Sequence, residues 1–195
     1  MNLEQHKKRE DMKVWLSIDE LDELIETTPD TEHRLMFELG GRCGLRSHEI
    51  LDVSPSDVVN TDAGWMLRVW HGKGDKFRET PMPPELAIRI QSIDDVREAK
   101  SSAPIISTNS TRTLRRWTAR GAQRMRERTG DEGWSHLSTH DLRRTWAGQL
   151  RAADVDALVV LPWGGWNDLE TFLDHYKGED TPETKRRERE KVDWL

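Results

Sequence analysis

Two stretches in the C-terminal part organise this chain: residues 138–146 read S-T-H-D-L-R-R-T-W, and residues 163–176 read W-G-G-W-N-D-L-E-T-F-L-D-H-Y. His140 and Arg143 are three residues apart, so a helix over the first stretch turns both side chains toward one face. The second stretch ends in Tyr176, the only tyrosine of the chain. An imidazole, a guanidinium and a phenol together favour a phosphate-binding clamp with a nucleophile beside it.

Three further positions add polar groups to this set. Trp166 follows a glycine pair in the second stretch, and its indole N–H is a second ring donor. Residues 44–49 read G-L-R-S-H-E and contain Arg46, while residues 72–76 read G-K-G-D-K and contain Lys73. Arginines, a lysine, a histidine and a phenol are the groups that phosphoryl transfer needs for charge neutralisation, proton transfer and nucleophilic attack.

In this order and at these spacings, the motifs resemble the catalytic domain of the tyrosine recombinases, the phage integrase family, from Trp15 to Lys177. The resemblance implies a mainly α fold with a small antiparallel β-sheet (α+β). It also implies a site-specific DNA recombinase, or integrase, that cuts and rejoins DNA through a 3′-phosphotyrosine intermediate and needs no cofactor. Two alternatives stay open: type IB topoisomerase-like strand relaxation, and a catalytically weak DNA-binding or assembly module.

The resemblance assigns the phosphate clamp to two arginines. Arg46 and Arg143 match the family arginines, and a planar guanidinium can bind two phosphate oxygens at once. Glu49, three residues after Arg46, matches the family's acidic position and is expected to orient the clamp. Taken alone, Arg46 could equally be an ordinary surface arginine, so the prediction depends on the combination of motifs.

The other catalytic roles fall, by the same resemblance, on residues of several types. His140 matches the histidine that contacts the phosphate or handles the proton of the nucleophile, and Trp166 matches a position that is histidine or tryptophan in relatives. Lys73 is the expected general acid for the 5′-oxygen, preferred over Lys76 because G-K-G is the family pattern. Tyr176 is the expected nucleophile. Each also has a structural alternative: a helix cap for His140, a core position for Trp166 and a packed phenol for Tyr176.

Two features depart from the family pattern. The family tyrosine commonly lies about nine residues beyond the Trp166 position, and here that place holds His175, with Tyr176 next. One residue turns a helix by ~100°, so the local helix has to start or bend differently for the phenol to reach a phosphate. Relatives also carry a helical core-binding domain ahead of the catalytic one. We expect either a fragment of a longer protein or a minimal variant that binds DNA from one side.

The composition limits the kinds of protein that this sequence can encode. Hydrophobic and charged residues each make up 34% of the 195 residues, and no apolar run reaches the ~18 residues of a membrane span, so we expect a cytoplasmic protein. The single cysteine, Cys43, excludes an internal disulfide. The net charge is −6, and 36 acids with only nine lysines among 30 basic residues are typical of a halophilic protein. An acidic chain that binds DNA needs its positive charge concentrated locally.

Residues 111–129 supply that concentration, on a predicted helix with a single acid, Glu127. Leu114, Trp117 and Met125 mark its buried stripe, and most of its arginines lie away from that stripe. Such a ridge can lie along a phosphate backbone, although a solvated basic face is the alternative. The predicted DNA-binding residues are Arg112, Arg115, Arg116, Arg120, Arg124 and Lys76.

Local patterns predict the remaining elements. Ser17 and Glu20 form a capping box at the start of the first helix, which Pro29 ends. A period of two predicts a β-hairpin whose glycine-rich tip holds Lys73. The strands are expected over residues 58–60, 64–70 and 77–82, and the other helices over residues 31–42, from Pro84, after His140, from Val155 to Pro162, and over residues 168–176.

These elements predict a simple domain organisation. We expect residues 1–14 to be a linker or tail, residues 15–180 to be the tyrosine recombinase catalytic domain, and residues 181–195 to be a C-terminal tail helix that can dock on a neighbouring protomer. The expected partner is double-stranded DNA. On DNA the resemblance implies a homo-oligomer, a dimer or tetramer, and the free domain is expected to be a monomer without a membrane partner.

Overall fold

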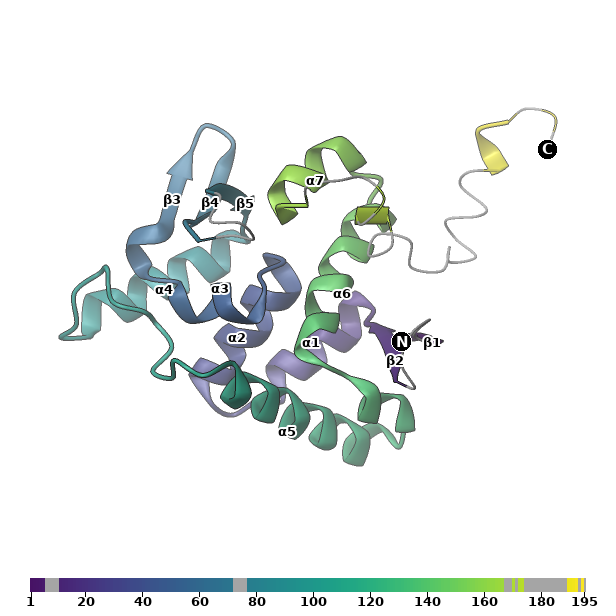
Figure 1. Cartoon of the computed structure of the whole chain (residues 1–195), viewed down its shortest axis with the longest axis horizontal. Coiled ribbons are helices and arrows are strands. Elements are labelled where there is room, and N and C mark those ends of the chain that lie inside the picture. Colours follow the sequence, from purple (N-terminus) through teal and green to yellow (C-terminus); the bar gives the residue numbers. More distant parts are fainter. Residues whose placement is uncertain are drawn as a thin grey trace.

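The computed structural model describes residues 1–5, 11–71, 77–166, 170, 172–173, 189–192 and 194. Within these residues, helices dominate and the strands form small antiparallel sheets (Figure 1). The predicted fold class, mainly α with a small antiparallel β-sheet, is confirmed. No helix in the described part of the chain combines the length and the apolar character that crossing a bilayer requires.

The first two helices begin where their capping residues predict. α1 (Ile18–Glu26) follows Ser17, whose hydroxyl accepts from the backbone N–H of Glu20 while the Glu20 carboxylate accepts from the N–H of Ser17. This reciprocal arrangement is the predicted capping box. α2 (Thr31–Arg42) begins after Asp30, whose side chain caps it, and it matches the predicted range.

A sharp turn at Gly44 connects α2 to α3 (Ser47–Asp52). Gly44 has φ +68°, a left-handed conformation that favours glycine. A Cβ there would also lie only 2.3 Å from Cε3 of Trp146, so no side chain fits at this position. The turn therefore reverses the chain against α6 and places Arg46 at the N-cap of α3.

β3 (Val58–Thr61), β4 (Gly64–Val69) and β5 (Arg78–Pro81) form an antiparallel sheet in that order, which confirms the predicted hairpin and third strand. Across the β4–β5 ladder, Val69 faces Arg78, and both side chains are buried. η1 (Pro55–Asp57) leads into the sheet, and α4 (Pro84–Val96) packs against it.

The C-terminal half supplies the long helices. α5 (Thr111–Thr129) matches the predicted arginine helix and ends at Gly130, which is left-handed. η2 (Glu132–His136) connects it to α6 (Thr139–Ala152), which packs along α2 in the middle of the molecule (Figure 1). α7 (Ala157–Gly164) lies beside the sheet and contacts β5.

The prediction that the helix from Val155 stops at Pro162 is wrong, because Pro162 lies inside α7. An interior proline removes one backbone donor and crowds the carbonyl four residues earlier, yet α7 continues through Gly164. The helix ends instead at Gly165, which has φ +63°. The N–H of Gly165 donates to the carbonyl of Pro162 at 2.9 Å, and that of Trp166 to the carbonyl of Leu161 at 3.1 Å. These two bonds form a Schellman motif, which fixes the direction of the carbonyls in the turn.

Residues 1–14 differ from the expected linker or tail. β1 (Asn2–Gln5) and β2 (Met12–Trp15) form an antiparallel pair. The N–H of Val14 donates to Asp141 Oδ1 at 3.2 Å, which ties β2 to α6. The polar composition of residues 1–14 does not predict these strands, because Asp141, the residue on α6 that anchors β2, is distant in the sequence. The expected helix over residues 168–176 lies largely outside the described residues.

The core occupies the space where α1, α2, α5 and α6 meet. Gly121 on α5 faces Phe37 on α2, and a Cβ at Gly121 would lie 2.7 Å from the Phe37 ring, so glycine allows the two helices to approach closely. A second apolar cluster contains Trp146, Trp166 and Phe172, beside α6 and α7. That cluster forms an apolar wall next to the polar residues described below.

Candidate active site

Arg46 and Glu49 form one side of the site, at the N-terminus of α3. The backbone N–H of Arg46 donates to Glu49 Oε2 at 2.7 Å, and Arg46 Nη1 donates to Oε1 at 2.8 Å. Glu49 occupies the third position of the helix, where a carboxylate normally reaches back to the N-cap. The Glu49 side chain is fully buried, and 17% of the Arg46 side chain is exposed. Glu49 therefore holds the Arg46 guanidinium at the rim of the site.

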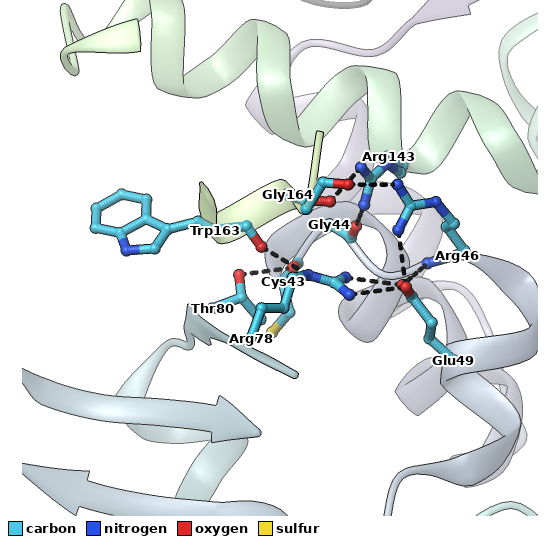
Figure 2. Close-up of polar contacts among 10 residues, drawn as sticks. Cys43, Gly44, Arg46, Glu49, Arg78, Thr80, Arg143, Trp163 and Gly164 are labelled. Carbon is cyan, nitrogen blue, oxygen red and sulfur yellow. Dashed lines mark hydrogen bonds and ion pairs between the residues drawn. The ribbon is translucent and has the colours of Figure 1, made fainter. Parts of the chain in front are cut away.

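Arg143 lies deeper, on α6, and is 2% exposed. Its Nη1 donates to the carbonyl of Gly44, and its Nη2 donates to the carbonyl of Gly164, both at 2.5 Å. Arg46 Nη2 donates to the next carbonyl, that of Gly165, at 3.1 Å. The turn that ends α7 thus presents consecutive carbonyls to two guanidinium groups that come from different helices (Figure 2).

Trp166 covers one face of Arg143. The centroid of its ring lies 4.1 Å from Arg143 Cζ. The same ring stacks on Trp146, with centroids 5.9 Å apart, and meets Phe172 edge to face at 4.9 Å. A cation over the face of tryptophan is attracted by the ring, and more strongly when both are desolvated. Trp166 is therefore at once a core residue and a support for the buried guanidinium.

Arg78, the first residue of β5, belongs to the same cluster and was missed by sequence reasoning. Its Nη1 and Nη2 donate to the two oxygens of Glu49 at 2.7 Å and 2.8 Å, and its Nε donates to the carbonyl of Trp163 at 2.9 Å (Figure 2). The signal available in the sequence was the period of the strand. Arg78 lies on the same face of the strand as Thr80 and Met82, which are both buried. The alternation of side chains along the strand therefore turns Arg78 toward the core.

Positive charge exceeds negative charge among the described residues of the site, where Arg46, Arg78 and Arg143 surround one carboxylate. Burial by itself would raise the pKa of Glu49, but hydrogen bonds and charge from Arg78, together with those from Arg46, lower it to about 2. Burial, followed by repulsion from Arg46, lowers the pKa of Arg143. A bound anion would offset both effects on Arg143, so the electrostatics of the site favour an anionic ligand.

The two clamp arginines keep donors for such a ligand. A guanidinium carries five N–H groups, and the hydrogen bonds from Arg46 and Arg143 to described residues use only part of them.

Thr80 on β5 connects the sheet to the end of α2 beside the site, because its hydroxyl donates to the carbonyl of Cys43 at 2.9 Å. Burial, and next the charge of Glu38, raise the pKa of the Cys43 thiol, so this cysteine is a packing residue and not a nucleophile.

The other predicted site residues are placed less fully. His140 lies in the first turn of α6, three residues before Arg143, and its side chain is exposed. Lys73, Lys76 and Tyr176 lie outside the described residues. The predicted residues that the fold brings together are Arg46, Glu49, Arg143 and Trp166.

The arginines of α5 divide into two groups. Arg124 is half-buried and donates to the hydroxyl of Thr28 at 2.8 Å, while Arg126 and Arg128 form ion pairs with neighbouring glutamates. The arginines of the first half are exposed and form no ion pair with any residue that the structure describes. We call this group the α5 ridge: Arg112, Arg115, Arg116 and Arg120.

Comparisons with known proteins find relatives in sequence and in fold. The model of the phage integrase family matches residues 14–182. Tyrosine recombinase XerC of Neisseria meningitidis serogroup B is 29% identical over 138 residues, which are 70% of this chain and 44% of XerC. The crystal structure of XerA recombinase has a TM-score of 0.72 at 20% identity, covering 92% of this chain and 64% of that chain. XerH recombinase bound to its difH substrate has a TM-score of 0.65 at 19% identity, covering 92% and 54%.

The chain spans about half the length of the curated relatives that it matches. The family match runs from β2 past α7 and so includes the clamp residues from Arg46 to Trp166. This chain therefore belongs to the phage integrase family, the family of the tyrosine recombinases.

Proposed function

We propose that this chain is the catalytic domain of a site-specific DNA recombinase, an integrase that cuts and rejoins DNA through a 3′-phosphotyrosine intermediate. The observation that carries the proposal is the convergence of Arg46 and Arg143 on consecutive carbonyls of one turn, beside one ionised carboxylate. Excess positive charge and remaining N–H donors suit the non-bridging oxygens of a single phosphodiester. A recombinase of similar fold was solved with its DNA substrate, which supports DNA as the ligand.

The proposed first step is an in-line displacement at phosphorus. The phenol oxygen of Tyr176 attacks the phosphorus and forms the phosphotyrosine bond, while the bond from phosphorus to the 5′-oxygen breaks. His140 receives the phenol proton or donates to the phosphate, and Lys73 gives a proton to the leaving 5′-oxygen. Arg46 and Arg143 stabilise the charge that builds on the non-bridging oxygens.

Rejoining reverses this step with the 5′-hydroxyl of a second strand as the nucleophile. The new bond from phosphorus to the 5′-oxygen forms as the phosphotyrosine bond breaks, and the phenol recovers its proton. The number of phosphodiester bonds is the same before and after. The covalent intermediate conserves the free energy of the bond that was cut, so the proposed cycle uses no nucleotide cofactor.

We assign the main contact with the DNA backbone to the α5 ridge. Spacings of three and four residues put its side chains on one helical face, opposite the buried Leu114 and Trp117. An arginine without an acidic neighbour keeps its full charge for phosphate, whereas Arg126 and Arg128 already face glutamates. Arg124 is therefore expected to contribute less than the sequence suggested, and Lys76 stays a prediction.

Assembly on DNA forms the second part of the proposal. The partner is double-stranded DNA, the free domain is a monomer, and copies associate once they are bound. The 84% exposure of Trp194, near the C-terminal end of the chain, supports residues 181–195 as the segment that docks on a neighbouring protomer. Deleting residues 183–195 should abolish cooperative DNA binding in gel-shift titrations while the far-ultraviolet circular dichroism stays unchanged. Unchanged cooperativity would remove this part of the proposal.

The activity is tested with a pool of nicked suicide duplexes of random sequence, incubated with the wild type and with Tyr176→Phe at several salt concentrations. We expect a protein–DNA adduct that survives denaturing detergent with the wild type and none with Tyr176→Phe. DNA binding without any tyrosine-dependent adduct would contradict recombination and indicate a DNA-binding module. Relaxation of supercoiled plasmid without need for a specific site would instead indicate a topoisomerase.

A further inference from the structure

We propose that Arg78 is a positioning residue of the phosphate clamp, a role that rests on the function proposed above. Arg78 is 7% exposed, and all three nitrogens of its guanidinium donate hydrogen bonds, to Glu49 and to the carbonyl of Trp163. It therefore acts through the groups that it holds: the carboxylate of Glu49 on one side and the last turn of α7 on the other (Figure 2).

The first of these contacts completes the coordination of Glu49. Oε1 accepts from Nη1 of both Arg46 and Arg78, while Oε2 accepts from the Arg46 backbone N–H and from Arg78 Nη2. A carboxylate offers about four lone-pair positions, so these bonds fill it. Half of them come from Arg78. Without that side chain, the carboxylate keeps only its two bonds from Arg46, so both the carboxylate and the Arg46 guanidinium are held less firmly.

The second contact fixes the turn that supports the clamp. Arg78 Nε donates to the carbonyl of Trp163, and the Arg78 side chain lies against Gly165, where an added Cβ would be 2.9 Å from Cδ. The carbonyls of Gly164 and Gly165 follow directly in the chain and accept from the two clamp arginines. Arg78 therefore braces the backbone segment on which both clamp guanidiniums rest.

The charge and the position of Arg78 extend this role. Glu49 carries one negative charge, and Arg78 shares it, so Arg46 retains more positive charge for a phosphate than it would in a simple pair. Arg78 also begins β5, opposite Val69, at the base of the β4–β5 hairpin and shortly after Lys73 in the sequence. One side chain thus links the base of the lysine hairpin to both halves of the clamp.

The test compares Arg78→Gln, Arg78→Lys and a matched control, Arg68→Gln. Arg68 lies on the neighbouring strand of the same sheet and also pairs with a carboxylate, Glu79 at 3.1 Å, but its side chain is 39% exposed. For each folded variant, the single-turnover rate constant for adduct formation is measured with nicked suicide duplexes. The Kd for an intact duplex is measured in parallel.

A positioning role predicts a split between these two measurements. Both Arg78 variants should lose about 10-fold or more in the rate constant, less than the 10²- to 10³-fold of a lost oxyanion donor because Arg78 acts through Arg46. Their Kd for DNA should stay within about twofold, because Arg78 is buried. Arg68→Gln should resemble the wild type in both. Arg78→Lys keeps the charge without the planar fork, so wild-type kinetics in this variant would overturn the proposal. If Arg78→Gln fails to fold, Arg78→Lys decides the question.

A readout without DNA separates this inference from the proposed function. Titration of the Glu49 carboxylate by ¹³C NMR should give a higher pKa in both Arg78 variants than in the wild type, with Glu49→Gln identifying the signal. Binding of inorganic phosphate, followed by calorimetry, should weaken several-fold in both variants and not in Arg68→Gln. If the wild type forms no adduct, the function fails while these measurements still test Arg78. Unchanged pKa and unchanged phosphate binding would overturn the inference itself.

Discussion

The arginines of the site and those of the α5 ridge place the same chemical group in opposite surroundings. Arg78 and Arg143 are buried, and carbonyls, a carboxylate and an indole ring hold their guanidinium groups. The ridge arginines are exposed and lack acidic partners among the described residues. Electrostatic interactions are strong in the dry interior and screened by salt at the surface. The comparison indicates two uses of arginine: a fixed geometry for chemistry at one phosphate, and solvated charge for attraction to many.

The largest expected effect comes from keeping the charge of Arg143 while changing its shape. Arg143→Lys retains a positive charge, but lysine lacks the fork that reaches the carbonyls of both Gly44 and Gly164. We expect the rate of adduct formation to fall about 10²- to 10³-fold, as for a lost oxyanion donor. Arg115→Lys on the ridge is the matched control and should change the rate less than about twofold. Similar losses of rate in both variants would contradict the distinction between buried site arginines and exposed ridge arginines.

The next effect concerns the indole that covers Arg143. Trp166→Ala removes the cation–π contact and leaves a cavity beside Trp146 and Phe172, so the free energy of unfolding should fall by about 3 kcal/mol. Urea denaturation followed by far-ultraviolet circular dichroism measures the change. Trp194→Ala, at an exposed tryptophan, should stay within about 0.5 kcal/mol of the wild type. A small loss for Trp166→Ala would mean that the buried guanidinium does not need this support.

A third effect appears at low pH, because Glu49 is the carboxylate that holds the buried cluster. Its pKa is about 2 in the fold and about 4.3 in an unfolded chain, so its ionised form favours the folded state. This contribution, about 3 kcal/mol at most, is complete above about pH 5 and is lost as the pH falls through about 2. Urea unfolding between pH 2 and pH 5 should show a shallower acid loss in Glu49→Gln than in the wild type. Parallel pH curves for the two proteins would contradict the lowered pKa.

The smallest expected effect concerns the arginines of α5 and the salt dependence of DNA binding. Replacing Arg115 and Arg116 together by glutamine should lower the slope of log Kd against log salt by about 1.8, since each phosphate contact contributes ~0.9. The same double replacement at Arg126 and Arg128, which already pair with glutamates, should change the slope by less than half as much. Fluorescence anisotropy with a labelled duplex, from 50 to 200 mM salt, measures both. Equal changes would show that the ion pairs on α5 do not withhold charge from DNA.

Local physics made several elements predictable. The capping box at Ser17 and the range of α2 depend on residues within one or two turns, so the sequence pattern was sufficient. The N-terminal strands were missed because β2 is anchored by Asp141, more than a hundred residues away. The end of α7 was misplaced because a proline is a weaker signal in a final helical turn than a left-handed glycine after it.

The residues of the candidate site also fall into those that local sequence explains and those that only distant contacts bring together. The resemblance to the family predicted that Glu49 orients Arg46, and the local geometry explains the contact, because three residues at a helix start bring a carboxylate back to the N-cap. Arg78 escaped notice because a charged residue in a hairpin strand is usually solvent-facing. The alternation of β5 turns Arg78 inward, but no pattern within the strand names its partners, which lie on α3 and in the last turn of α7.

The sequence pattern was enough to identify most of the helices, the hairpin of β4 and β5 and the helix that carries the basic ridge, because propensity, capping and periodicity act over a few residues. Tertiary structure alone decided that Arg46 and Arg78 share the carboxylate of Glu49 and that Arg46, Arg78 and Arg143 all donate to carbonyls at the C-terminal end of α7. The physical reason is that buried guanidiniums need partners wherever the fold supplies them. Here those partners are carbonyls and a carboxylate from segments far apart in the chain.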